Sequence, residues 1–179
     1  MVFSKVANME EPPYDVKYMQ CFARYREKNV ADLSYRRPFP SIEVLYKYKL
    51  SNTLDKSILG IKVTFPPGAS TPPHTHAGAF VAATVLTGSV LNKMNDDPMT
   101  VKKAGDSFYE APGCRHRISN NASQTEEASM IANLILETEK MDALMAESGP
   151  AGLVVIDEEY KDMVLEQMRL QADLPESSA

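Results

Sequence analysis

The sequence predicts an all-β core with helical extensions at both ends, and two observations lead to this prediction. Between residues 41 and 139, short runs of alternating apolar and polar residues recur and are separated by turn-forming dipeptides. Alternation with a period of two is the pattern of a half-buried strand. About eight short strands without a convincing helix favour a sandwich or a small barrel. Outside this region the sequence is richer in helix formers.

The composition limits the classes of function. The chain has 179 residues, of which 44% are hydrophobic and 24% charged, and its net charge is −5, as is ordinary for a globular domain. It has no basic stripe, so no nucleic-acid partner is expected. No apolar run approaches the ~18 residues of a membrane span, and no signal-peptide core is present. We expect a cytoplasmic protein with no membrane partner, in which Cys21 and Cys114 are free thiols.

The first forty residues predict a helical or irregular extension. Tyr14, Tyr18, Phe22 and Tyr25 fall on one face of a helix, and such a stripe packs on the core or across a dimer contact. The proline-containing run at residues 35–40 ends the helix, because proline disfavours helical geometry in the residue before it. We expect a homodimer, since sheet edges and apolar stripes need covering and two-fold dimers are the commonest oligomer.

The expected strands follow one another with clear turn signals. They lie in SIEVLYKYKLS, SILGIKVTF, AFVAATVLTGSVLNKM, TVKKAGDSFYEAPG, HRISNNAS and EASMIANLILETE. Helix formers return after Glu139, in EKMDALMAES, GPAGLVVI and DEEYKDMVLEQMRLQAD. The last stretch opens on acidic residues, which suit a helix N-terminus.

The three histidines of the chain are candidate metal ligands. His74 and His76 are separated by one residue, so on a strand they point to the same face. Neutral imidazoles placed in this way can share a zinc, iron, nickel or copper ion. The third ligand has to come from elsewhere in the fold, and His116 is the remaining histidine.

The residues around these histidines resemble the two motifs of the cupins. Gly68, His74, His76 and Gly88 match the first motif, and the second is matched by Gly105-Asp106, Pro112-Gly113, His116 and Asn120. The resemblance implies a jelly-roll barrel, or double-stranded β-helix, that holds a metal with its motif histidines. It divides the chain into an N-terminal extension at residues 1–40, a barrel at 41–140 and a C-terminal extension at 141–179.

The sequence departs from the cupin pattern at one metal ligand. The glutamate of the first motif is absent, and Phe80 or Val81 occupies its place. A neutral set of three histidines remains, which can hold a divalent Fe, Zn, Ni or Mn ion and leave positions open for substrate. A metal-free pocket in a degenerate cupin is the alternative.

Several further residues are expected near the site. Glu110 is a candidate catalytic acid or base together with His116, and it can also replace the missing glutamate in the metal shell. Strand parity leaves open whether Glu110 or Tyr109 points inward, because a bulge is expected nearby. The substrate pocket is expected to be mostly apolar and to be lined by Phe80, Ala82, Thr84, Tyr109 and Cys114.

These residues favour a metal-dependent enzyme that acts on a small, largely apolar or aromatic molecule, in the manner of a tailoring step of secondary metabolism. Oxygen-dependent chemistry by a dioxygenase and Lewis-acid chemistry by an isomerase, cyclase or decarboxylase both fit a three-histidine site. Two alternatives remain. One is a non-catalytic small-molecule binder, and the other is a metal-free enzyme that uses His116 and Glu110 as an acid–base pair.

Overall fold

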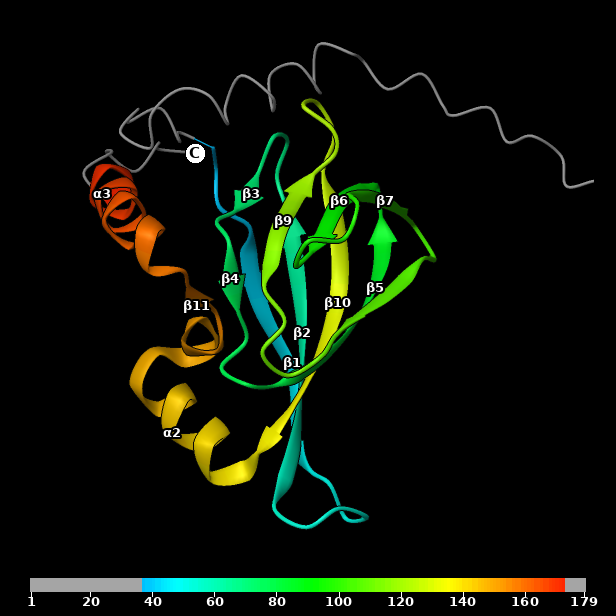
Figure 1. Cartoon of the computed structure of the whole chain (residues 1–179), viewed down its shortest axis with the longest axis vertical. Helices are drawn as coiled ribbons and strands as arrows, with labels where there is room; N and C mark the ends of the chain where they lie inside the picture. Colours follow the sequence, from blue (N-terminus) through cyan, green and yellow to red (C-terminus); the bar gives the residue numbers. More distant parts are fainter. Residues whose placement is uncertain (1–36, 173–179) are drawn as a thin grey trace, which may run out of the picture. The chain divides into compact units, whose positions relative to one another are not determined.

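The computed structural model describes residues 37–172 of the chain, which form two antiparallel sheets followed by a helical segment (Figure 1). The predicted all-β core is thereby confirmed. The expected N-terminal helix, with its aromatic stripe, and Cys21 lie outside the described residues.

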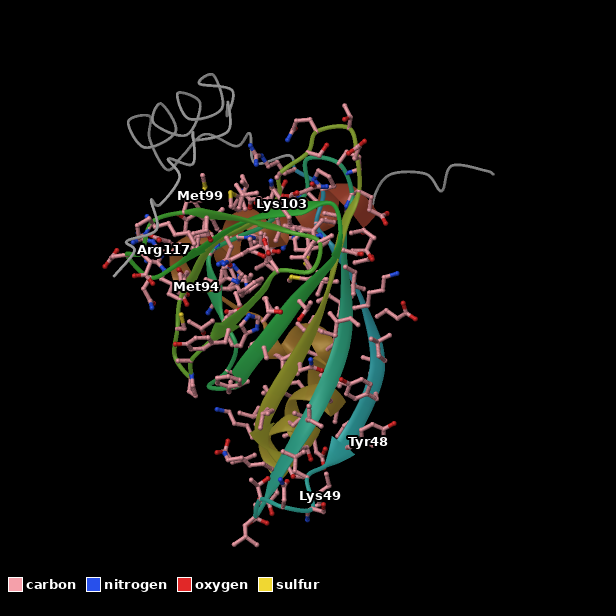
Figure 2. The ribbon with its side chains drawn as sticks, turned by 90° about the vertical axis from the view of Figure 1, so that its right-hand side faces the viewer. Tyr48, Lys49, Met94, Met99, Lys103 and Arg117 are labelled. Atoms are coloured by element: carbon pink, nitrogen blue, oxygen red, sulfur yellow. The ribbon has the colours of Figure 1, made fainter. Side chains whose placement is uncertain are left out.

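The first sheet has five strands in the order β1-β2-β10-β5-β8. Their bounds are Ser41–Lys49 for β1, Lys56–Phe65 for β2, Ala128–Glu137 for β10, Phe80–Thr87 for β5 and Ser107–Glu110 for β8. The central strands β2 and β10 pair in unbroken register over their full length. Tyr48 and Lys49, labelled in Figure 2, lie at the end of β1 that is remote from Arg117.

The second sheet follows the order β11-β4-β9-β6-β7, and β3 also pairs with β9. Its strands are β3 (Ser70–Thr71), β4 (His74–Thr75), β6 (Ser89–Met94), β7 (Thr100–Lys103), β9 (His116–Asn121) and β11 (Val155–Ile156). Strands β3 and β4 are short because Pro72 and Pro73 stand between them, and proline cannot donate a hydrogen bond to a sheet ladder.

The apolar core lies between the inner faces of the two sheets. Its largest fully buried side chains include Leu59, Phe65, Leu134 and Leu136, which alternate along β2 and β10 with more exposed residues. Gly88, the last glycine of the first motif, has φ 68°, and a Cβ there would lie 2.7 Å from the carbonyl oxygen of Glu127. Only glycine fits this turn between β5 and β6 without strain.

The C-terminal extension consists of α2 (Thr138–Ser148), the 3₁₀ turn η1 (Gly149–Leu153), β11, a second turn η2 (Glu158–Tyr160) and α3 (Lys161–Ala172). Both helices agree with the prediction. The apolar run GPAGLVVI does not continue the helical pattern, because Gly149 takes a left-handed φ of 60° and residues 155–156 then pair with β4. Among residues 37–172, no helix has the length and apolarity to cross a membrane.

Candidate functional site

The three histidines meet on the inner face of the second sheet. His74 on β4 and His116 on β9 are direct cross-strand partners, and their ring centroids are 5.1 Å apart. The ring of His76 stands edge-on to that of His74 at 4.8 Å. The candidate ligand atoms of all three lie within 4.8 Å of one another. The sequence prediction that these side chains converge is confirmed.

Backbone carbonyls orient two of the three imidazoles. His74 Nδ1 lies 2.7 Å from the carbonyl oxygen of Pro72, and His76 Nδ1 lies 3.3 Å from that of Leu153. A carbonyl oxygen only accepts hydrogen bonds, so each Nδ1 carries the proton. The Nε2 atom of each ring therefore keeps a free lone pair, which is the state that a metal ligand needs.

Glu110 orients the third imidazole. Its Oε1 lies 3.2 Å from His116 Nδ1, and its Oε2 lies 3.3 Å from His76 Nε2. Within the described residues, His116 Nε2 and Glu110 Oε2 are buried and have no hydrogen-bond partner. Buried polar atoms without partners are costly. The donor set of three imidazoles and one carboxylate, with unpaired atoms in its middle, fits a divalent transition metal.

The sequence leaves open whether Tyr109 or Glu110 points inward, and the pairing of β8 with β5 decides between them. Glu110 is only 3% exposed whereas Tyr109 is 66% exposed, so Glu110 is the inward residue. Its cross-strand partner is Val81, one of the two residues in the place of the motif glutamate. Glu110 thus brings a carboxylate to the same region of the barrel from the neighbouring strand.

The surroundings hold His74 neutral and Glu110 ionised. Burial, together with the nearby His116 and His76, lowers the pKa of His74 to about 3, so this imidazole remains free of a second proton at neutral pH. Burial raises the pKa of Glu110, but the close contacts of its carboxylate with His116 and His76 outweigh burial and hold that pKa well below its usual range. A neutral imidazole beside a carboxylate suits cation binding.

The low pKa of His74 predicts that acid destabilises the metal-free protein. An unfolded histidine takes up a proton near pH 6.5, whereas folded His74 does so only near pH 3. Between these values the unfolded state binds the extra proton, so the free energy of unfolding falls as the pH is lowered through this window. Urea unfolding of chelator-treated protein at about pH 6.5 and about pH 5 measures this slope, and His74→Asn is expected to make it shallower. An equal slope in both proteins would contradict the assignment.

A cavity of about 250 Å³ opens beside the histidines. Apart from Glu110 on β8, its wall from the first sheet is apolar, and no lysine or arginine is among the described residues that line it. Its polar lining is confined to the three histidines, Glu110, Thr71 and Ser119. The residues that β2, β5 and β10 contribute to this wall are Ile61, Val63, Phe65, Val81, Met130, Ala132 and Leu134.

Four of the residues expected in the pocket lie on the outer face of the first sheet instead. Phe80 stacks on Tyr109 there with ring centroids 5.9 Å apart, and Thr84 pairs with Ser107 through hydroxyls 2.9 Å apart. The prediction assumed that the alternation of inward and outward residues continues unbroken from His76 into β5. The turn at Ala77 and Gly78, with φ values of 53° and 86°, interrupts that alternation. The prediction is therefore wrong for Phe80, Ala82, Thr84 and Tyr109, and Val81 on the other face lines the cavity.

Cys114 is also absent from the cavity wall. It is partly exposed and unpaired with another cysteine among the described residues, and its sulfur accepts a hydrogen bond of 3.3 Å from Asn95 Nδ2. Burial and the negative charge of Glu110 raise its pKa, which disfavours the reactive thiolate. The pocket role expected for Cys114 is wrong.

The sequence prediction missed the part of the wall that the C-terminal extension supplies. Residues of η1, β11 and α3 and of the loop between them line the cavity, namely Ala151, Val154, Ile156, Val164 and Met168. This segment is fixed by the pairing of β11 with β4 and by Arg115, which binds the carboxylates of Asp157 and Glu159. The apolar run GPAGLVVI was the available signal in the sequence.

The family model of the cupin domain matches residues 61–132, which include all three histidines, Glu110 and most of the cavity wall. The chain therefore carries a cupin domain at residues 61–132. The matched region runs from Ile61 in β2 to Ala132 in β10, and the C-terminal segment that closes the cavity lies beyond it.

Several solved structures resemble this chain at low identity. The cupin domain of Cnp3 from Schizosaccharomyces pombe is 15% identical with a TM-score of 0.46, over 63% of this chain and 72% of that one. A predicted oxalate decarboxylase from Thermotoga maritima is 22% identical with a TM-score of 0.40, over 55% and 92%. An oxalate oxidase in complex with glycolate is 20% identical with a TM-score of 0.43, over 84% and 78%. No curated protein matches the chain.

Proposed function

We propose that this cupin is a metal-dependent enzyme that acts on a small, largely apolar organic molecule. The observation that carries the proposal is the arrangement of the three histidines, each with its Nδ1 facing an acceptor. This arrangement leaves the three Nε2 atoms free as ligands beside an apolar cavity. His74, His76 and His116 would hold a divalent Fe, Zn, Ni or Mn ion.

The metal would supply Lewis-acid polarisation or, if it is iron, oxygen-dependent chemistry. The side chains around it have separate tasks. Glu110 fixes the ring of His116 through Oε1 and keeps Oε2 free of hydrogen bonds. That second oxygen can complete the metal shell, or take a proton from a substrate and return it. The apolar wall excludes water and strengthens these interactions.

The cavity favours a substrate other than a small dianion. Two of the structural neighbours are named for oxalate chemistry, but the described wall of this cavity offers no lysine or arginine to neutralise a second carboxylate. An apolar or aromatic body with one oxygen-containing head group suits this lining better, since each buried apolar group adds to binding.

Elemental analysis of freshly purified, untagged protein tests the proposal. We expect about one first-row transition metal per chain, by the preference of imidazole ligands, and loss of that metal in His74→Ala and His116→Ala. The identity of the metal then selects the assay, with iron directing it to oxygen uptake and zinc or nickel to isomerase and lyase reactions.

Reconstitution provides the decisive comparison. If the wild type stays metal-free after incubation with each ion, the proposal fails. Metal-free protein that still binds apolar ligands would be either a non-catalytic binder or a metal-free acid–base enzyme. Cys114→Ser is a matched control, because Cys114 is two residues from His116 but does not line the cavity, and its metal content should equal that of the wild type.

A second candidate function is a metal-free acid–base enzyme. It is favoured by the contact between Glu110 Oε1 and His116 Nδ1 at 3.2 Å in an apolar surrounding, a geometry that suits proton transfer. Activity that survives chelation but disappears in His116→Ala would support this candidate.

A cytoplasmic location and a homodimeric state remain predictions. The homodimer rests on the exposed outer face of the first sheet and on its edge strand β1.

A further inference from the structure

We propose that the cavity contains a second polar subsite, formed by the hydroxyls of Thr71 and Ser119, that binds a hydrogen-bonding group at the far end of the substrate. This inference rests on the proposed function for the role of the metal end. It adds a requirement on the ligand, which is that its apolar body carries polar groups at both ends.

The two polar ends of the cavity are built on the same strands. Thr71 on β3 and Ser119 on β9 are cross-strand partners, as are His74 on β4 and His116 on β9. Each member of the hydroxyl pair is three residues from a member of the histidine pair. At the usual rise of a strand the pairs are separated by roughly 10 Å.

A spacing of three would normally place the two pairs on opposite faces of the sheet. Two irregularities prevent this. Pro72 and Pro73 interrupt the chain between β3 and β4, and β9 carries an extra residue, Arg117, where its register with β6 shifts. Both pairs therefore line the cavity. Ser119 is 6% exposed, so its hydroxyl is held within this interior rather than in solvent.

A third polar residue lies next to the pair. Asn92 on β6 is the cross-strand partner of Ser119, is 7% exposed, and its Oδ1 has no hydrogen-bond partner within residues 37–172. A buried acceptor without a donor is unfavourable. The Ser119 hydroxyl can both donate and accept a hydrogen bond, so a ligand hydroxyl or carbonyl that reaches it can be bound.

The opposite wall between the two polar ends is apolar. It consists of alternate residues of β2 and β10, including Ile61, Val63 and Ala132. A ligand that lies along this wall would place one oxygen at the histidines and a second at Thr71 and Ser119. Molecules of this class have a rigid aromatic or short aliphatic body with a carboxylate, enolate or phenolate at one end and a hydroxyl or carbonyl at the other.

Calorimetric titration with matched probes tests the subsite. We would use cinnamate against its para-hydroxy analogue, and octanoate against its omega-hydroxy analogue, with metal-free and metal-loaded protein. The hydroxylated member of at least one pair is expected to bind about fivefold more tightly, as for one good hydrogen bond. In Thr71→Val and Ser119→Ala the two members of each pair should bind about equally well, and the probe without the hydroxyl should keep its wild-type affinity.

The controls use a similar pair of hydroxyls outside the cavity. Thr84 and Ser107 are cross-strand partners on the outer face, so Thr84→Val and Ser107→Ala should keep the wild-type preference. Three results would overturn the subsite. They are equal affinity for both members of each pair, no binding of any probe, and a preference that persists in Thr71→Val and Ser119→Ala. A preference seen in protein that never binds metal would sustain the subsite and refute the proposed function instead.

Discussion

Replacing Glu110 by glutamine is expected to lower the affinity for a divalent metal by about 10–100-fold, the range found when a group that orients or completes a metal shell is lost. Glu110 is the one carboxylate among the described residues that line the cavity. Its two oxygens lie 3.2 Å from His116 Nδ1 and 3.3 Å from His76 Nε2. Glutamine keeps the shape of the side chain but removes the negative charge that attracts the ion. Competition with a chromogenic chelator measures the change.

Two further variants separate the possible roles of Glu110. Glu110→Asp keeps the charge on a shorter side chain and should give an intermediate affinity. Glu137→Gln removes a carboxylate from the same sheet that is exposed and paired with Lys56 at 3.0 Å, and it should leave metal affinity unchanged. If Glu110→Gln binds metal as tightly as the wild type, the negative charge of Glu110 does not contribute to metal binding.

The Leu153→Ala substitution is expected to weaken both the fold and the metal site. Leu153 is 1% exposed, and truncating such a side chain costs about 2–5 kcal/mol. Its carbonyl oxygen also accepts the hydrogen bond from His76 Nδ1, so loosening η1 frees the ring of His76. We expect metal affinity to fall about tenfold, as for other groups that orient a ligand. Urea unfolding and chelator competition measure the two effects.

Leu136→Ala is the matched control for this experiment. Leu136 is equally buried at 1% exposure, but it lies on β10 and is absent from the cavity lining. It should lose a similar free energy of unfolding with little change in metal affinity. Equal losses of metal affinity in the two variants would show that general destabilisation, and not the position of His76, is responsible.

The strands and the histidine site were predictable because their signals are local. The alternation in SILGIKVTF and EASMIANLILETE corresponds to β2 and β10, which pair along their whole length. The histidines could be placed together because β-strand parity relates His74 to His76, and the second motif adds His116. The fold and the convergence of the three histidines thus follow from patterns that extend over a few residues.

The cavity wall was less predictable because it depends on contacts between distant parts of the chain. The inward orientation of Glu110 follows from its pairing with Val81, which no local pattern determines. The error at Phe80 and Ala82 arose at one turn, where the left-handed Ala77 and Gly78 shift the parity of everything that follows. The C-terminal wall needs β11 to return to β4, a contact across about eighty residues.

Because β11 pairs with β4, the local stability of the C-terminal segment should depend on whether the cavity holds an ion or a ligand. Strand β4 carries His74 and lies between β9 and β11, and the amide of Asp157 donates to the carbonyl oxygen of Pro73 at 3.0 Å. Detachment of this segment removes one wall of the cavity. A bound ion or ligand that touches both sides raises the free energy of that local opening. Deuterium uptake by the amides of residues 155–157 should therefore slow as the site fills. The degree of slowing would report how fully the site is occupied, without an activity assay.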